Sequence, residues 1–136
     1  MINVAILGFG TVGSGVYEIL KKNPEAIAKK AGDILNIKYI LDIRSFDDHP
    51  ERELFTKNFD DIINDDTVDI IVEVMGGLEP AYTFTKSALL KGKTVVTSNK
   101  ELVATHGTEL IKIAKDMSVN YFFEASVGGG IPIIRP

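Results

Sequence analysis

The chain has 136 residues and a formal net charge of −4, with 45% hydrophobic and 25% charged residues. These proportions are typical of a single globular domain and exclude an intrinsically disordered chain. The absence of cysteine excludes a disulfide scaffold, a cysteine-ligated metal and a thiol nucleophile. The acidic balance argues against nucleic acid and membranes as partners, and no apolar stretch approaches the roughly 18–20 residues of a membrane span. We therefore expect a cytoplasmic protein that acts on a small molecule.

The first half of the chain alternates short apolar runs with segments of helical spacing. Residues 2–7 form an apolar run that ends in glycine, which predicts a buried strand followed by a helix. A further short helix is expected within residues 23–33 and a second strand at residues 37–42. Residues 45–57, which include several acidic residues and a proline, are expected to form a loop and to be the segment most prone to disorder.

The second half continues the same alternation, after a short amphipathic piece at residues 59–63. A third strand is expected at residues 68–74, a helix from Pro80 to about residue 90, and further strands at residues 94–97 and 120–123. Strands that alternate with helices in this way predict an α/β fold. We expect a doubly wound, mostly parallel sheet with helices on both faces.

The helical region that follows residue 97 carries two local signals. Ser98 and Glu101 have the spacing of a capping box, so a helix is expected to begin at Ser98. The pair His106-Gly107 is expected to divide this region into two helices. We expect His106 to be structural and His49 to be solvated in its polar loop, and neither histidine is assigned chemistry.

A glycine motif lies between the first expected strand and the helix after it. Gly8-Phe9-Gly10-Thr11-Val12-Gly13 has the G-x-G-x-x-G spacing, in the strand-to-helix context that a dinucleotide fingerprint requires. Gly8 permits a tight turn, Gly10 lets a pyrophosphate approach the backbone, and Gly13 lets the helix pack on the strand. The alternative is a set of turn and packing glycines without a ligand. We favour dinucleotide binding at this turn, and hence a Rossmann-type sheet.

Two charged residues follow the second strand and bear on the choice of cofactor. Asp42 suits the ribose hydroxyls of NAD, whereas Arg44 lies where a guanidinium would hold the 2′-phosphate of NADP. Either charge would alternatively do no more than cap the end of the strand. We lean slightly toward NADP without excluding NAD.

Two later motifs are expected at the same edge of the sheet. Gly76 and Gly77 follow the third strand and remove side chains where a nicotinamide ribose would pass, although a plain loop is the alternative. Ser98 and Lys100 open a helix directly after the next strand, and both are expected in the cofactor site. A lysine held at a helix start suits proton exchange with a substrate oxygen, whereas most lysines in this position are only solvated. We assign Lys100 the catalytic role.

The last motif runs from residue 124 to residue 132 and contains three consecutive glycines. A carboxylate together with backbone carbonyls suits a hard, weakly held cation. A hinge to a following domain is the alternative, and both interpretations are compatible.

Together these motifs resemble the amino-terminal, nucleotide-binding part of homoserine dehydrogenase, in family order and over nearly the whole chain. The resemblance implies NAD(P)-dependent interconversion of L-aspartate 4-semialdehyde and L-homoserine, on the way to threonine and methionine. By position, Phe9, Thr11 and Val12 would line the cofactor phosphates, Arg44 would lie near the adenosine ribose, and Lys100 would match the catalytic lysine. The residues that would match the family's monovalent cation site, usually sodium, are Glu124, Val127, Gly129 and Ile131.

The resemblance also sets expectations about the whole protein. Residues 1–136 would form the NAD(P)-binding domain, and a substrate and dimerisation domain would follow beyond residue 136. The full-length protein would then be a homo-oligomer, and the fragment alone would be inactive. A dinucleotide-sensing regulatory module without catalysis and a related amino-acid-pathway dehydrogenase are the alternatives.

Overall fold

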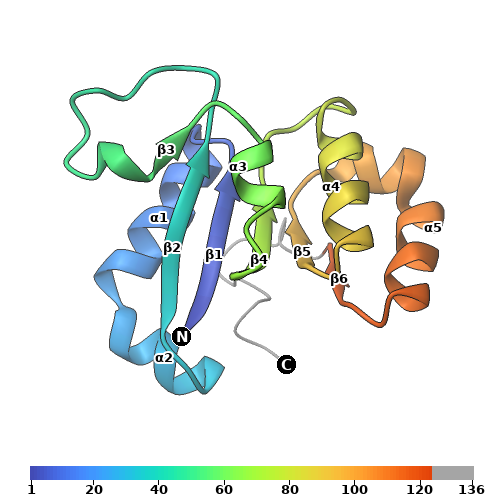
Figure 1. Ribbon diagram of the computed structural model, residues 1–136, viewed down its shortest axis with the longest axis horizontal. Coiled ribbons are helices and arrows are strands. Elements are labelled where there is room, and N and C mark those ends of the chain that lie inside the picture. The colour runs from blue at the N-terminus through green and yellow to red at the C-terminus, as the bar shows by residue number, and fades with distance from the viewer. Residues whose placement is uncertain (124–136) are drawn as a thin grey trace.

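The computed structural model describes residues 1–123 and shows one parallel sheet of six strands in the order β3-β2-β1-β4-β5-β6 (Figure 1). The strands are β1 (Ile2–Leu7), β2 (Leu35–Leu41), β3 (Phe55–Thr56), β4 (Val68–Glu73), β5 (Thr94–Thr97) and β6 (Tyr121–Phe122). The helices are α1 (Thr11–Lys22), α2 (Pro24–Ala31), a short 3-10 helix η1 (Arg52–Leu54), α3 (Asp60–Ile63), α4 (Ala81–Leu90) and α5 (Lys100–Asp116). The expected α/β fold is confirmed.

Helices cover both faces of the sheet, with α1 and α2 on one side and α4 and α5 on the other (Figure 1). Alternate residues of β1 point to opposite faces of the sheet. Val4 and Ile6 pack in the core beneath α1 and α2, whereas Ala5 and Leu7 pack in the core beneath α3, α4 and α5. All four are completely buried. Because both faces are covered, residues 4–7 of this strand are all apolar.

The order of the strands reverses at β1, which pairs with β2 on one side and with β4 on the other. The chain reaches β2 across the face covered by α1, and it reaches β4 across the opposite face. The two crossovers therefore diverge at the carboxyl end of β1. Open α/β sheets bind ligands at such a point.

The turn after β1 depends on a close contact between two glycines. Gly8 has a φ of +101°, a conformation that L side chains rarely adopt. A Cβ atom on Gly13 would lie 1.9 Å from the Gly8 carbonyl oxygen, so α1 can approach the end of β1 this closely because Gly13 has no side chain. The predicted roles of Gly8 in the turn and Gly13 in helix packing are confirmed.

Residues 45–51 form turns, as the expected loop would, but the expectation was wrong for the end of the segment. The segment contains η1 and β3, and β3 pairs with the end of β2 through Ile40–Phe55 and Leu41–Thr56. His49 is half-buried rather than solvated, because its ring contacts those of Phe9, Tyr17 and Phe55. A two-residue edge strand has no detectable periodicity, so the sequence pattern gave no sign of it.

The start and the continuity of α5 also differ from expectation. Asn99 rather than Ser98 caps the helix, because the Asn99 side chain accepts a hydrogen bond from the Leu102 amide. The helix runs unbroken through His106 and Gly107. Gly107 lies on the buried face, where packing outweighs the cost of about 1 kcal/mol for a glycine inside a helix.

We expect Gly13→Ala to destabilise the fold by about 1–3 kcal/mol or more, because its methyl group would overlap the Gly8 carbonyl. Gly15→Ala is the matched control on the same helix. A Cβ atom there would meet no described atom within 4 Å, so that variant should gain about 0.5–1 kcal/mol. Urea unfolding followed by circular dichroism measures both, and equal stability of the two variants would contradict the packing role of Gly13.

Candidate dinucleotide-binding site

A cavity of about 430 Å³ opens at the carboxyl edge of the sheet. Its size falls within the roughly 300–1,000 Å³ typical of small-molecule sites. The residues that line it come from the ends of β1, β2, β3 and β4 and from the start of α4: Gly8, Gly10, Leu41, Asp42, Ile43, Arg44, Lys57, Val74, Met75, Gly76, Glu79, Pro80 and Phe84. Apolar walls therefore meet glycine backbone and two cationic side chains in one hollow.

The amino end of α1 contributes backbone donors beside this cavity. Gly10 is the N-cap residue, and in the described part of the chain no side chain caps the helix. The amides of its first turn therefore have no side-chain cap, at the end where the helix dipole is positive, and this is the arrangement that favours anions. A Cβ atom on Gly10 would meet no described atom within 4 Å, so the space beside this lining residue of the cavity is open.

Asp42 and Arg44 form a clasp at the end of β2. The Asp42 carboxylate accepts hydrogen bonds from the Phe9 amide (2.9 Å), the Arg44 amide (2.9 Å) and the Arg44 guanidinium (2.9 and 3.0 Å). The Arg44 guanidinium lowers the pKa of Asp42 to about 2, against the opposing effect of burial. The Asp42 side chain is 7% exposed and the Arg44 side chain 59% exposed. Both carboxylate oxygens are thus already occupied, while Arg44 remains open to solvent.

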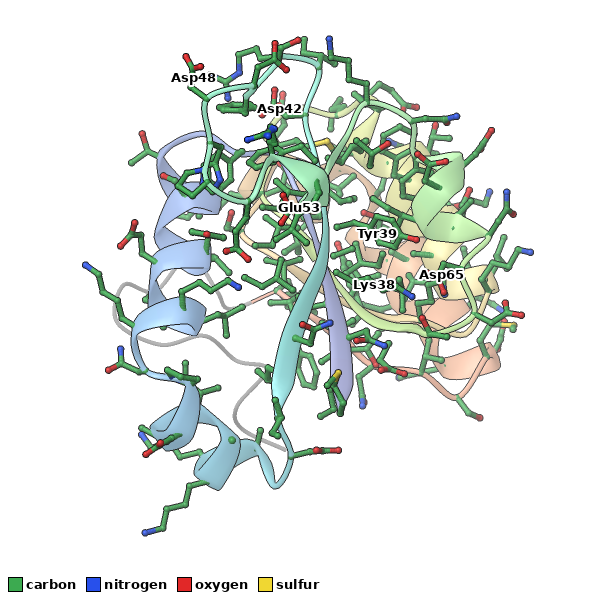
Figure 2. All side chains as sticks on the ribbon, turned by 60° about the vertical axis from the view of Figure 1, so that its left-hand side comes forward. Lys38, Tyr39, Asp42, Asp48, Glu53 and Asp65 are labelled. Carbon is green, nitrogen blue, oxygen red and sulfur yellow. The ribbon has the colours of Figure 1, made fainter. Side chains whose placement is uncertain are left out.

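An aromatic cluster holds this clasp against α1. The Phe9 ring contacts the rings of Tyr17, Phe46, His49 and Phe55, with centroids 5.0–5.7 Å apart. The Arg44 guanidinium carbon lies 5.3 Å from the centroid of the Phe46 ring. Figure 2 shows Asp42 at the end of β2, close to the loop that carries Asp48. The Phe9 side chain therefore points into this cluster and positions the glycine turn through its backbone.

A second polar network lies at the ends of β4 and β5. The Glu73 carboxylate is completely buried and accepts hydrogen bonds from the Thr97 hydroxyl (2.6 Å) and the Met75 amide (2.9 Å). The Thr97 oxygen accepts a hydrogen bond from the Asn99 amide (2.9 Å), and the Asn99 side-chain amide donates to the Gly77 carbonyl (2.6 Å). The glycine turn after β4 is thereby tied to the start of α5.

The structure brings together only part of the predicted cofactor site. The predicted residues that line the cavity are Gly8, Gly10, Asp42, Arg44 and Gly76. Those that do not are Phe9, Thr11, Val12, Gly13, Gly77, Ser98 and Lys100. Thr11 and Val12 are exposed on the first turn of α1, and Lys100 is exposed at the first turn of α5. Their roles toward a ligand stay predictions.

Sequence reasoning did not assign the other lining residues to the site, and two of them, Lys57 and Ile43, bear on how a ligand would bind. Lys57 follows β3 and lines the cavity with Arg44, and its ammonium group donates to the Ser45 hydroxyl (2.8 Å). Ile43 is 88% exposed at the rim. Lys57 was overlooked because it lies in a segment expected to be a loop, and the pairing of β3 with β2 is what brings it to the cavity.

The predicted monovalent cation site of Glu124, Val127, Gly129 and Ile131 lies outside the described residues and stays a prediction. Within residues 1–123, no group of three or more acidic, histidine or cysteine side chains is placed to hold a metal ion. None of the helices in the same range has the length and apolar character needed to cross a lipid bilayer.

The parallel sheet, the glycine turn at its switch point and the uncapped helix beside the cavity define a dinucleotide-binding domain of the Rossmann type. The sequence profile of the family described as homoserine dehydrogenase, NAD binding domain, matches residues 8–124. The chain belongs to this family, as the sequence resemblance indicated.

Known proteins similar to this chain carry the same family name. The homoserine dehydrogenase of Bacillus subtilis (strain 168) is 40% identical over 138 residues, which cover 98% of this chain and 32% of that protein. The crystal structure of a homoserine dehydrogenase from Thiobacillus denitrificans matches with a TM-score of 0.86 and 41% identity, over 97% of this chain and 31% of that one. A hyperthermophilic archaeal homoserine dehydrogenase in complex with NADPH matches with a TM-score of 0.76 and 31% identity, over 98% and 46%. The chain spans about a third of the length of the curated relatives it matches.

We expect the Asp42 clasp to make stability depend on acid pH. The folded-state pKa of Asp42, about 2, lies below its ordinary value of 3.8, so its stabilising effect is present above pH 4 and lost as pH falls toward 2. The difference in unfolding free energy between wild type and Asp42→Asn should therefore shrink over that interval. Urea unfolding at a series of pH values measures it, with Asp48→Asn as a matched removal of one carboxylate from the same loop. A difference independent of pH would contradict the clasp.

Proposed function

We propose that this chain is the dinucleotide-binding part of a larger homoserine dehydrogenase, which interconverts L-homoserine and L-aspartate 4-semialdehyde. The observation that carries the proposal is the open glycine turn at Gly10, beneath the uncapped start of α1 and beside a cavity of sufficient size. About 40% identity to homoserine dehydrogenases over nearly the whole chain supports the choice among dehydrogenases.

The remaining two-thirds of the relatives' length would supply the rest of the enzyme. We assign the substrate site and the contacts of a homo-oligomer to that part. This chain would then bind the cofactor and contribute one side of the reaction centre. The activity belongs to cytoplasmic synthesis of threonine and methionine.

The chemistry of the lining residues suits a nicotinamide dinucleotide, which supplies or accepts a hydride when bound. The first-turn amides of α1 would hold the pyrophosphate, because they lie at the positive end of the helix and have no side-chain cap within the described residues. Ile43 offers an apolar surface at the rim for the adenine. Gly76 has no side chain and leaves room for the nicotinamide ribose to pass the end of β4.

We assign NADP as the preferred form of the cofactor. Arg44 and Lys57 place two positive charges beside the end of β2, which suits a 2′-phosphate. The Asp42 carboxylate would have to release its amide and guanidinium donors before it accepted hydrogen bonds from ribose hydroxyls. The resemblance to an archaeal enzyme that binds NADPH supports the same choice.

Lys100 would exchange the proton that accompanies hydride transfer. Reduction of an aldehyde leaves a negative charge on oxygen, and the lysine ammonium group would donate a proton to it or stabilise the charge. Oxidation of the alcohol would return the proton to a neutral lysine. Lys100 is exposed at the amino end of α5, which follows β5 at the same edge of the sheet as the cavity.

Titration of the chain with NADPH and NADH tests the cofactor site. Gly10→Val should weaken both cofactors strongly, because its side chain would stand in the open space where the proposed pyrophosphate lies, and its Cβ atom would meet no described protein atom within 4 Å. Arg44→Ala should weaken NADPH about ten- to hundredfold, the effect of losing a hydrogen bond to a charged group, and should leave NADH nearly unchanged. Tryptophan is absent from the chain, so calorimetry or NAD(P)H fluorescence is the measurement.

Each outcome of this titration has a distinct meaning. Unchanged affinity in Gly10→Val would contradict dinucleotide binding at the turn. Equal losses of NADPH and NADH in Arg44→Ala would show that Arg44 supports the loop and does not select the 2′-phosphate.

Steady-state kinetics of the full-length enzyme tests the role of Lys100. Lys100→Ala should lower kcat by about 10²-fold or more, as the loss of a positioned proton-transfer group does. The affinity for NADPH should change far less, because the phosphate-binding residues lie elsewhere in the site. Lys91→Ala is a control on another exposed lysine. A normal kcat in Lys100→Ala would show that Lys100 is only a solvated surface residue.

A further inference from the structure

Three buried polar side chains lie between the glycine turn after β4 and the start of α5. Glu73 and Thr97 are completely buried, and Asn99 is 5% exposed. They come from the ends of β4 and β5 and from the N-cap of α5. None of the three lines the cavity, so direct contact with the cofactor does not account for them.

The hydrogen bonds of these residues run in one continuous chain. Glu73 accepts from the Met75 amide and from the Thr97 hydroxyl, and Thr97 in turn accepts from the Asn99 amide. The Asn99 side chain then forms hydrogen bonds with two different segments. Its amide group donates to the Gly77 carbonyl, and its oxygen accepts from the Leu102 amide.

Asn99 therefore fixes two segments at once. It caps the helix whose first residue is Lys100, and it holds the turn in which Gly76 and Gly77 have φ values of +79° and +74°. Thr97 sets the orientation of Asn99, and Glu73 sets the orientation of the Thr97 hydroxyl. The backbone of Lys100 is thereby held relative to the glycine turn by buried side chains.

We propose that Glu73, Thr97 and Asn99 are positioning residues, which hold Lys100 and the Gly76–Gly77 turn in the mutual geometry that the reaction requires. The inference rests on the proposed function, because it assigns the network to the proton-transfer residue of that reaction. A displacement of about 1 Å at a reacting group is enough to lower a rate about 10²-fold.

The chemistry of the network explains why an acidic residue occupies the end of β4. A carboxylate has two acceptor oxygens and serves the Met75 amide and the Thr97 hydroxyl together. A glutamine of the same shape has one acceptor and one donor group, so it cannot accept from both. Among residues 1–123 Glu73 has no cationic partner, which leaves hydrogen bonding as its role.

The test compares Thr97→Val with Thr97→Ser in the full-length enzyme. Valine keeps the shape of threonine but removes the hydroxyl that joins Glu73 to Asn99, whereas serine keeps the hydroxyl. We expect kcat per NADPH-binding site to fall about ten- to hundredfold in Thr97→Val and to recover in Thr97→Ser. The dissociation constant for NADPH should stay within about threefold, because the phosphate-binding half of the site is not altered.

A matched control separates positioning from loss of stability. Lys93 is 5% exposed at the opposite end of β5, where its ammonium group donates to the carbonyls of Asp65 and Val68. Lys93→Met removes buried hydrogen bonds as Thr97→Val does, but far from α5's first turn. It should lower the melting temperature and leave kcat per NADPH-binding site unchanged.

The outcomes distinguish this inference from the proposed function. If Lys100→Ala lowers kcat but Thr97→Val does not, the positioning role is overturned and the role of Lys100 stands. A normal kcat in Lys100→Ala overturns the catalytic assignment itself, and the positioning role with it. If Thr97→Val does not fold, Asn99→Ser carries the same test, since serine still caps α5 but cannot reach the Gly77 carbonyl. A normal kcat in that variant overturns the inference.

Discussion

The contact between Gly13 and the carbonyl of Gly8 is the constraint on which the cofactor half of the site depends. A side chain at position 13 would overlap that carbonyl, so the first turn of α1 lies against the end of β1 only because none is present. This approach directs the unpaired amides of α1 toward the edge of the sheet. It also fixes Phe9, whose amide donates to Asp42 and whose ring enters the aromatic cluster.

Two acidic residues then shape the edge in the same way on either side of β1. Asp42 follows β2 and accepts a hydrogen bond from the amide of Arg44, and Glu73 ends β4 and accepts one from the amide of Met75. Each carboxylate thus accepts a hydrogen bond from the backbone amide two residues later and fixes the turn that follows its strand. The two differ in their further partners, because Asp42 binds a cation and Glu73 binds a hydroxyl.

Features that repeat over many residues, or that need a particular backbone conformation, could be predicted from the sequence. Features that depend on a single tertiary contact could not. Apolar periodicity located the main strands, and the spacing of Gly8, Gly10 and Gly13 located the turn. The edge strand at Phe55–Thr56 depends on its pairing with β2, which no local pattern reports. Asn99 rather than Ser98 caps α5 because hydrogen bonds to the Thr97 hydroxyl and the Gly77 carbonyl, both outside the helix, hold it in place. Lys57 lies at the cavity for the same reason, because the pairing of β3 with β2 brings it there.

The two ends of the site are held by different means, which suits two different tasks. The clasp and its cations at the end of β2 are partly exposed, so they can form new contacts with a charged ligand at small cost. The network at the ends of β4 and β5 is buried and satisfied, and it leaves little freedom to the start of α5. Under the proposed function, binding energy gained at the first end is used to place the reacting atoms at the second. A rigid second end is what makes that placement effective, because reaction rates are more sensitive than affinities to small displacements.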